Sequence, residues 1–175
     1  MAKTRCAWAG DDPVYQKYHD LEWGVPLHSD KKLFEFLILE GMQAGLSWIT
    51  ILKKREAFRE AFDSFDYNKV AGYSQAKIDE LMQNPGIIRN KLKIHAAVTN
   101  ARAFLQVRKE FGTFNKYIWG FVDNIPPAKC MAQYAGTARQ YTTGRSHLKR
   151  PEKKRLQFCR ADHSLLTYAG NGHGE

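Results

Sequence analysis

The sequence lacks the features that would place a protein in a membrane or outside the cell. Its longest apolar run, Phe36–Leu39, is far shorter than the roughly 18 residues of a membrane span. No apolar segment of the secretory-signal type follows the first residues. Only three cysteines occur, which are too few for a disulfide framework and favour a reducing compartment. We therefore expect a cytoplasmic protein with no membrane partner.

Acidic residues are also scarce, with 18 Asp and Glu against 27 Lys and Arg and a net charge of +9. Such an excess is typical of proteins that bind polyanions. It is concentrated in residues 128–175, which hold nine Lys and Arg against three Asp and Glu. Residues 1–127 are only mildly basic, and they hold 18 of the 22 aromatic residues. Charge alone is therefore weak evidence for nucleic-acid binding, and residues 1–127 are the candidate folded domain.

Strand-type alternation is almost absent, whereas apolar residues recur at helical spacing. Five helices are predicted from this spacing and from capping residues: about 31–41, 48–62, 74–83, 89–108 and 113–123. The sequence therefore predicts an all-α fold. Three segments within it depart from simple helix patterns.

The first segment is residues 40–48, where Glu40 ends an apolar run and two glycines flank a corner before Trp48. Glu40 is either a solvated residue at a helix end or a carboxylate that faces a cavity. In a cavity, loss of solvent would make it a hydrogen-bonding or charge-stabilising group.

The second segment is the hairpin of residues 84–91, in which Pro85 and Gly86 turn the chain between two helices. Such a turn points the free N–H groups of the next helix outward, where they can bind phosphate. Ile87 and Ile88 would fix the turn against both helices. An ordinary helical hairpin would have the same pattern.

The third segment, residues 6–23, combines aromatic residues with two possible metal ligands: Trp8, Tyr15, Tyr18, Trp23, Cys6 and His19. The aromatic side chains form either part of the core or a cage that stacks on a planar ligand. Cys6 and His19 suit zinc, but two ligands do not make a site. From the residues alone, a buried cysteine and a hydrogen-bonded histidine explain this pair better.

Seven motifs occur in order: Arg5-Cys6-Ala7-Trp8, Asp12-Pro13-Val14-Tyr15, Tyr18-His19-Asp20, Glu22-Trp23-Gly24-Val25-Pro26, Leu39-Glu40-Gly41, Gln43-Ala44-Gly45-Leu46-Ser47-Trp48 and Gly86-Ile87-Ile88-Arg89. Together they resemble the DNA-3-methyladenine glycosylase I family of the helix-hairpin-helix superfamily. The resemblance runs from about Thr4 to Pro127. It implies a helix-hairpin-helix glycosylase-like bundle that acts as a monomer on double-stranded alkylated DNA. There it would hydrolyse the N-glycosidic bond of a flipped-out N3-methyladenine.

The resemblance also implies roles for individual residues. Glu40 and Tyr18 are the catalytic candidates, because the matching residues hydrogen-bond to the damaged adenine. The residues that would stack around this base or support its binding site are Trp48, Tyr15, Trp8 and Trp23. The residues that would contact the DNA are Gly45 and Leu46, which enter the gap in the base stack, and Gly86, Ile87 and Arg89 of the hairpin. The family lacks the catalytic aspartate of its superfamily, so no such residue is named.

Zinc is structural in this family, and the resemblance implies no cofactor for the chemistry. The family pairs the residues that match Cys6 and His19 with a His and a Cys near the C-terminus. Those two do not appear, because Cys159 and His163 stand in the reverse order and in a different context. Nothing after about Pro127 resembles the family.

A change of reading frame would account for this break. Lys154–Asp162 can be encoded by codons that, read one base later, give the family-like Arg-Gly-Phe-Asn-Phe-Val-Gly-Pro. We therefore predict a single-base frameshift near residues 128–133, which leaves residues 128–175 as an out-of-frame, poorly ordered basic tail and the bundle incomplete at its C-terminus. Two alternatives to an active glycosylase stay open, namely a non-catalytic helical DNA-binding module and an inactive truncated product.

Overall fold

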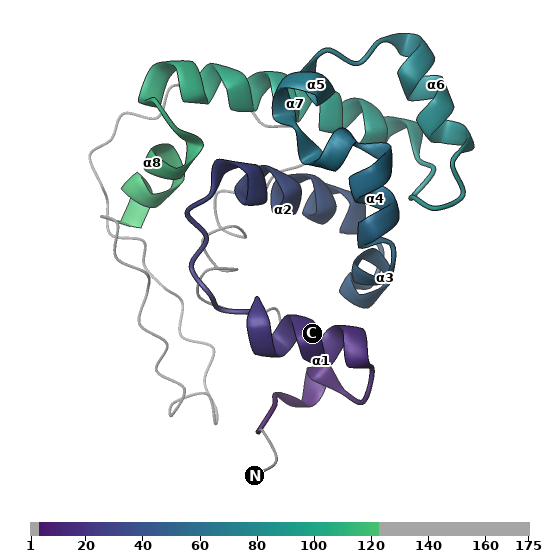
Figure 1. The fold of residues 1–175 in the computed structure, drawn as a ribbon, viewed down its shortest axis with the longest axis vertical. Helices are drawn as coiled ribbons and strands as arrows, with labels where there is room; N and C mark the ends of the chain where they lie inside the picture. The colour runs from purple at the N-terminus through teal and green to yellow at the C-terminus, as the bar shows by residue number, and fades with distance from the viewer. Residues whose placement is uncertain (1–3, 123–175) are drawn as a thin grey trace.

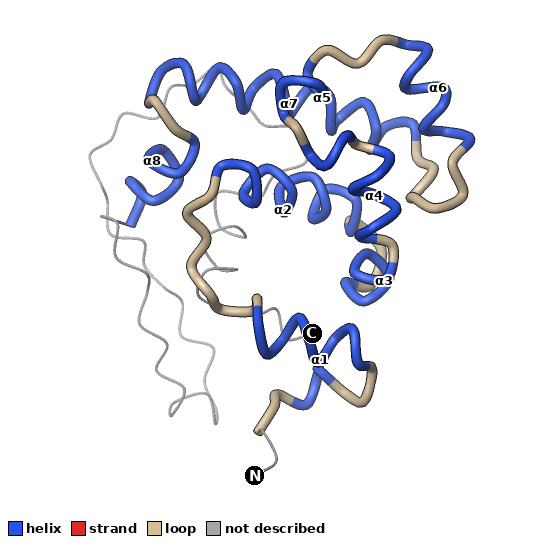
Figure 2. Tube along the Cα trace, in the orientation of Figure 1, coloured by secondary structure: helices blue, strands red, loops and turns tan. Residues whose placement is uncertain are grey.

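The computed structural model describes residues 4–122, which form helices joined by short loops (Figure 1). No strand occurs within this range (Figure 2), so the predicted all-α class is confirmed. The α-helices are α1 (Pro13–Leu21), α2 (Asp30–Gln43), α3 (Trp48–Lys53), α4 (Arg55–Ala61), α5 (Tyr67–Ala71), α6 (Gln75–Gln83), α7 (Lys91–Phe111) and α8 (Phe114–Trp119). The 3-10 helices are η1 (Ala7–Ala9), η2 (Asp63–Phe65) and η3 (Gly120–Val122).

Helix α2 is at the centre of the core. Every residue from Leu33 to Leu39 is buried, so this helix is covered on all sides rather than along one stripe. Helices α3, α7 and α8 pack on it, and Figure 1 shows α7 lying along its length. Phe34 of α2 meets Phe104 of α7 with 5.1 Å between ring centroids, and Phe104 stacks on Phe114 of α8 at 4.2 Å.

The carboxylate of Asp30 joins the ends of three helices. It lies in the first turn of α2 and accepts hydrogen bonds from the backbone N–H groups of Phe114 and Asn115 at the start of α8. It also accepts a 2.7 Å bond from Nε of Arg108, near the end of α7. A negative charge is favourable at a helix N-terminus. The Asp30 carboxylate lies at two such ends, those of α2 and α8.

The five predicted helices all occur, with one correction. The pattern predicts a single helix over 48–62, but the chain forms α3 and α4 with a break at Lys54, where φ is −98° and ψ is 0°. No glycine or proline marks this break. The Lys54 ammonium instead donates to the carbonyl oxygens of Pro85 and Gly86 in the hairpin, a contact that a local pattern cannot reveal.

Helix α1 was not among the predicted helices, although two local signals mark its start. The Asp12 carboxylate accepts from the N–H groups of Val14 and Tyr15, as a capping residue does. Pro13 occupies the first helical position, where its missing N–H is harmless.

Helix α1 lies at the far end of the molecule from α7 and packs on α3 (Figure 1). Two ion pairs attach it to the rest of the fold. Lys53 contacts Asp12 at 2.7 Å, and Arg55 contacts Glu22 at 2.7 Å.

Three consecutive residues of η2 have positive φ although none is glycine, namely Asp63 (50°), Ser64 (53°) and Phe65 (55°). A left-handed backbone costs about 1–2 kcal/mol per residue for L-amino acids. Tertiary contacts hold this turn, because Phe65 is buried in the core and the Tyr73 hydroxyl donates to Asp63.

None of the helices in residues 4–122 combines the length and the apolar character needed to cross a bilayer. The predicted domain boundary at Pro127 and the predicted out-of-frame tail of residues 128–175 lie outside the described residues.

Candidate functional site

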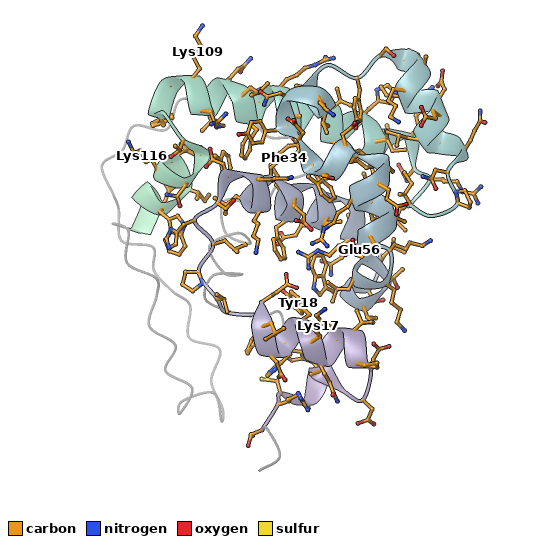
Figure 3. The ribbon with its side chains drawn as sticks, viewed as in Figure 1. Lys17, Tyr18, Phe34, Glu56, Lys109 and Lys116 are labelled. Carbon is orange, nitrogen blue, oxygen red and sulfur yellow. The ribbon has the colours of Figure 1, made fainter. Side chains whose placement is uncertain are left out.

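Tyr18 connects two groups of aromatic side chains at the interface of α1 with α3. Its ring meets Trp48 of α3 edge-on at 5.8 Å and lies 6.4 Å and 6.5 Å from Trp8 and Tyr15. Trp8 also packs on Tyr15 at 4.9 Å and on Trp23 at 5.3 Å. We call Trp8, Tyr15, Tyr18, Trp23 and Trp48 the aromatic cluster. In Figure 3, Tyr18 lies on the side of α1 that faces α2 and α3.

Local structure brings these rings together. Tyr15 and Tyr18 are three residues apart on α1 and therefore share a face of the helix. After α1, the N–H of Trp23 donates to the carbonyl of Tyr18, and this turn returns Trp23 to the same face. Tyr18 and Trp48 are almost fully buried, with 3% and 6% of their surface exposed, whereas Trp8, Tyr15 and Trp23 are half-buried.

Glu40 lies on the side of α2 that faces this cluster. Phe36, one turn earlier on the same helix face, stacks on Trp48 with 6.2 Å between ring centroids and 26° between planes. One carboxylate oxygen of Glu40 is buried, as are the Tyr18 hydroxyl and the Trp48 Nε1. This burial argues against a fully solvated helix end and favours a carboxylate that faces the interior.

A buried ion network lies behind the cluster. Nε of Arg55 donates to Oε1 of Glu35 at 2.7 Å, and its NH1 donates to both carboxylate oxygens of Glu22. Arg59 also donates to Glu35, at 2.8 Å from NH2. Burial lowers the pKa of Arg55, but the charges of Glu35 and Glu22 outweigh this effect, and the pKa is raised above its ordinary value. The guanidinium therefore remains charged and fixes α1, α2 and α4 to one another.

The predicted DNA-wedge residues lie in residues 43–47, which run from the last residue of α2 to the start of α3 and which we call the 43–47 loop. Gly45 has φ +77°, a left-handed conformation that favours glycine. Leu46 is 39% exposed, and its N–H donates to the carbonyl of Gln43 at 2.6 Å. The loop therefore holds an apolar side chain at the surface.

The hairpin is anchored on α4. A Cβ at Gly86 would lie 3.0 Å from the Cβ of Ala57 and 3.0 Å from Oδ1 of Asn84, so this position needs glycine for packing within the protein. Ile87 is buried, whereas Arg89 is exposed. The Asn90 side chain accepts from Lys93 and caps α7.

The start of α7 offers free donors at the surface. Within residues 4–122, no acceptor meets the backbone N–H of Arg89, Lys91 or Leu92. All three residues are exposed. The geometry matches the sequence-based expectation of outward N–H groups at this turn.

Cys6 and His19 are adjacent. The N–H of Cys6 donates to Nε2 of His19 at 3.3 Å, so the ring proton is on Nδ1, which contacts the Asp20 carboxylate at 3.1 Å. Arg5 holds the same carboxylate with two hydrogen bonds. A carboxylate on one ring nitrogen is typical of metal-binding histidines. Among residues 4–122, however, no group of three or more potential ligands occurs.

The structure thus brings together the five aromatic candidates and places Glu40 on the facing helix. Gly45 and Leu46 lie in a separate loop, and Gly86, Ile87 and Arg89 lie in the hairpin. Sequence reasoning missed Lys54, Arg55 and Lys93, whose partners are distant along the chain. One signal was available, because Glu35 interrupts the apolar run of α2 and a buried carboxylate requires a partner.

Comparisons with known proteins identify related sequences and structures. A sequence model of the family described as methyladenine glycosylase matches residues 8–159, which extends beyond Pro127, where the motif resemblance ends. A DNA-3-methyladenine glycosylase from Haemophilus influenzae is 51% identical over 123 residues, covering 70% of this chain and 66% of that protein. DNA-3-methyladenine glycosylase 1 from Escherichia coli K12 is 51% identical over 122 residues, covering 70% and 65%.

A solved structure shares the fold. A variant of 3-methyladenine DNA glycosylase I in complex with 3-methyladenine superposes with a TM-score of 0.68 at 44% identity, covering 71% of this chain and 67% of that one. The chain spans just under two thirds of the length of the two curated relatives.

Proposed function

The chain belongs to the methyladenine glycosylase family, and on this premise we propose that it excises N3-methyladenine from alkylated double-stranded DNA. The reaction is hydrolysis of the N-glycosidic bond, a step of base excision repair. The observation that carries the proposal is the aromatic cluster around Tyr18, with Glu40 on the helix that faces it.

The chemistry of the lesion suits such a site. Methylation at N3 places a positive charge on adenine and weakens its glycosidic bond. The base leaves as a neutral molecule, so strong acid catalysis is unnecessary. The enzyme must instead extrude the damaged nucleotide, hold it and admit water to C1′.

The aromatic cluster supplies ring faces, which attract a cationic base more than a neutral one. Trp48 and Tyr15 would stack around the base, and Trp8 and Trp23 would support them. The Glu40 carboxylate would complement the positive charge, and the Tyr18 hydroxyl would bond to the base. Glu40 and Tyr18 each have a buried polar atom. This burial supports these roles, because hydrogen bonds and the attraction between charges are stronger away from water.

Two surface elements would bind the DNA. Leu46, exposed beside Gly45, would fill the gap that the extruded base leaves in the stack. The free N–H groups at Arg89, Lys91 and Leu92 would bind backbone phosphate, as in a helix-hairpin-helix element. These contacts would position the duplex without reading its sequence.

Zinc would have a structural role and no part in the chemistry. Cys6 and His19 would supply two of four ligands, with Nε2 of His19 exchanging its bond from the Cys6 N–H for the metal. The Asp20 contact with Nδ1 fits such a role. The C-terminal His and Cys that complete the site in the family do not appear in this sequence.

The test of the function is base release from methylated duplex DNA by the full 175-residue chain. Released bases are separated by chromatography for the unmodified chain, Glu40→Gln and Trp48→Ala. We expect release of 3-methyladenine by the unmodified chain and a loss of about 100-fold or more in both variants, in line with removal of a group that stabilises the transition state. Glu60→Gln, at an exposed position on α4, is the matched control and should retain full activity.

Other outcomes distinguish the alternatives. Binding of duplex DNA without any base release would favour a non-catalytic DNA-binding module. Neither binding nor release by a folded chain would favour an inactive truncated product. Normal release by both variants would remove Glu40 and Trp48 from the site.

A further inference from the structure

Two lysines each donate hydrogen bonds from their ammonium group to two backbone carbonyl oxygens. Nζ of Lys93 donates to the carbonyls of Met42 and Ala44 at 2.8 Å and 2.6 Å. Nζ of Lys54 donates to the carbonyls of Pro85 and Gly86 at 3.2 Å and 3.3 Å. We call Lys54 and Lys93 the lysine pair.

The bonds of the lysine pair cross between the two surface elements. Lys54 follows α3, which begins directly after the 43–47 loop, yet it holds the hairpin. Lys93 lies in the first turn of α7, which begins directly after the hairpin, yet it holds the 43–47 loop. Each lysine therefore follows one element at a short distance along the chain, Lys54 after α3 and Lys93 in the first turn of α7, and bonds to the other element.

Further contacts close this arrangement. The hairpin packs on α4 through Gly86 and Ala57. Ile38 and Gly41 of α2 and Lys93 of α7 line a common hollow, so the end of α2 adjoins the start of α7. The loop and the hairpin are thus attached to the same group of helices, with the lysine pair as the direct connection.

We propose that Lys54 and Lys93 are positioning residues that make the 43–47 loop and the hairpin one rigid DNA-contacting unit, rather than phosphate ligands. This inference rests on the proposed function. Such a unit fixes the distance from Leu46, which would enter the stack, to the N–H groups that would hold phosphate. The extruded nucleotide then lies at a constant offset from the bound phosphates.

The surroundings of the two ammonium groups favour a positioning role. The N–H groups of both ammonium groups donate to backbone carbonyl oxygens. Both lysine side chains are half-buried, whereas Arg89 and Lys91 nearby are exposed. Burial also lowers the pKa of Lys93. A lysine that serves phosphate is better placed with its ammonium in solvent, where it attracts the anion from a distance.

Amide hydrogen exchange in the free, full-length protein tests the connection without DNA. The reporters are Leu46 in the loop and Ile87 and Asn90 in the hairpin, whose N–H groups donate to Gln43, Asn84 and Ile88. We expect Lys93→Met and Lys54→Met each to accelerate exchange about tenfold or more in both elements, because charge-assisted bonds are lost. Lys91→Met is the matched control and should leave exchange unchanged.

Duplex affinity at several salt concentrations tests the role in binding. Loss of a phosphate contact reduces the slope of log K against log salt by about 0.9. We expect Lys93→Met and Lys54→Met to weaken binding about tenfold or more with the slope unchanged, and Arg89→Met to lower the slope. Lys93→Arg, which can still donate to the carbonyls, should restore most of the affinity.

The two experiments separate the proposals. If each lysine affects exchange only in the element that it contacts, or in neither, the rigid unit is overturned. A slope reduced by about 0.9 in either Met variant would overturn the positioning role in favour of a phosphate contact. If the unmodified chain does not bind DNA, the proposed function fails, and the exchange experiment still decides on the rigid unit. If a Met variant does not fold, Gln at the same position serves the same tests.

Discussion

The guanidinium of Arg55 lies over the ring of Phe36, with Cζ 5.0 Å from the ring centroid. Phe36 also stacks on Trp48 of the aromatic cluster. Arg55 also bonds to Glu35 and Glu22 and is only 8% exposed. One charged side chain thus supports the cluster through a ring contact and ties α1 to the core through an ion pair.

Replacement of Arg55 should therefore destabilise the protein strongly. We expect Arg55→Met to lower the free energy of unfolding by about 3 kcal/mol, because Glu35 would remain buried with a charge that, among residues 4–122, only Arg59 offsets. Urea unfolding measures this change. The double variant Arg55→Met/Glu35→Leu should be more stable than Arg55→Met, since the buried carboxylate is then absent, and Lys109→Met at an exposed position is the control. Equal stability of the single and double variants would contradict this explanation.

Gly45 and Gly41 form a matched pair for the effect of backbone conformation. A Cβ at either position meets no atom within 4 Å, but only Gly45 has a positive φ. We expect Gly45→Ala to lower stability by about 1 kcal/mol or more. Gly41→Ala within α2 should raise stability by about 0.5 kcal/mol, because alanine favours the helix. Thermal unfolding of the two variants compares them, and equal effects would show that the loop conformation is not the cause.

The pair of Tyr73 and Asp63 predicts a pH window for one stabilising contact. The Tyr73 hydrogen bond holds the pKa of Asp63 below its ordinary value. Burial and the Asp63 bond raise the pKa of Tyr73 above its ordinary value. The lowered pKa of Asp63 stabilises the folded protein at pH values above the carboxyl pKa of the unfolded chain, near 4. The raised pKa of Tyr73 stabilises it at pH values below the phenol pKa of the unfolded chain, near 10.

The stability difference between the unmodified chain and Tyr73→Phe should therefore be constant between about pH 4 and pH 10. It should shrink below this range as Asp63 becomes protonated, and above it as Tyr73 ionises in the unfolded chain. Urea unfolding across this range tests the prediction, with Tyr67→Phe as the control. A difference that does not change with pH would assign the effect to packing alone.

Zinc content tests the metal prediction independently of activity. A tetrahedral structural site needs four ligands, and residues 4–122 offer Cys6 and His19 without a third nearby. We expect the 175-residue chain to retain less than one equivalent of zinc after dialysis, measured by atomic spectrometry. Stoichiometric zinc that is lost in Cys6→Ser would contradict this expectation and assign further ligands to the chain after residue 122, such as Cys159 or His163.

Local patterns predicted the helices well, because caps and apolar spacing are local properties. Ser74 starts α6 with a side-chain bond to Lys77, as the pattern indicates. The contact of Lys54, at the break between α3 and α4, could not be predicted in this way, because its partners Pro85 and Gly86 are more than 30 residues away. The same holds for Lys93, whose carbonyl partners are 49 and 51 residues away.

The residues of the candidate site could be predicted from the sequence, but the contacts that hold them in place could not. Motif resemblance selected Tyr18, Glu40 and Trp48, and the structure places them around one interface. Gly86 is predicted to contact the DNA as part of the hairpin, and the structure adds a separate reason for glycine at this position, its packing against Ala57. Contacts with Ala57 depend on how α4 and the hairpin meet, which a motif does not contain.

The position of Asp30 also has a consequence for synthesis of the chain on the ribosome. Its partners in α8 are 84 and 85 residues further along the sequence, and α7, which covers α2, precedes them directly. At about 5–20 residues per second, α2 emerges several seconds before these elements exist. During that interval its apolar residues have no native cover from α7 or α8, so the nascent N-terminal half depends on shielding until the second half has been translated.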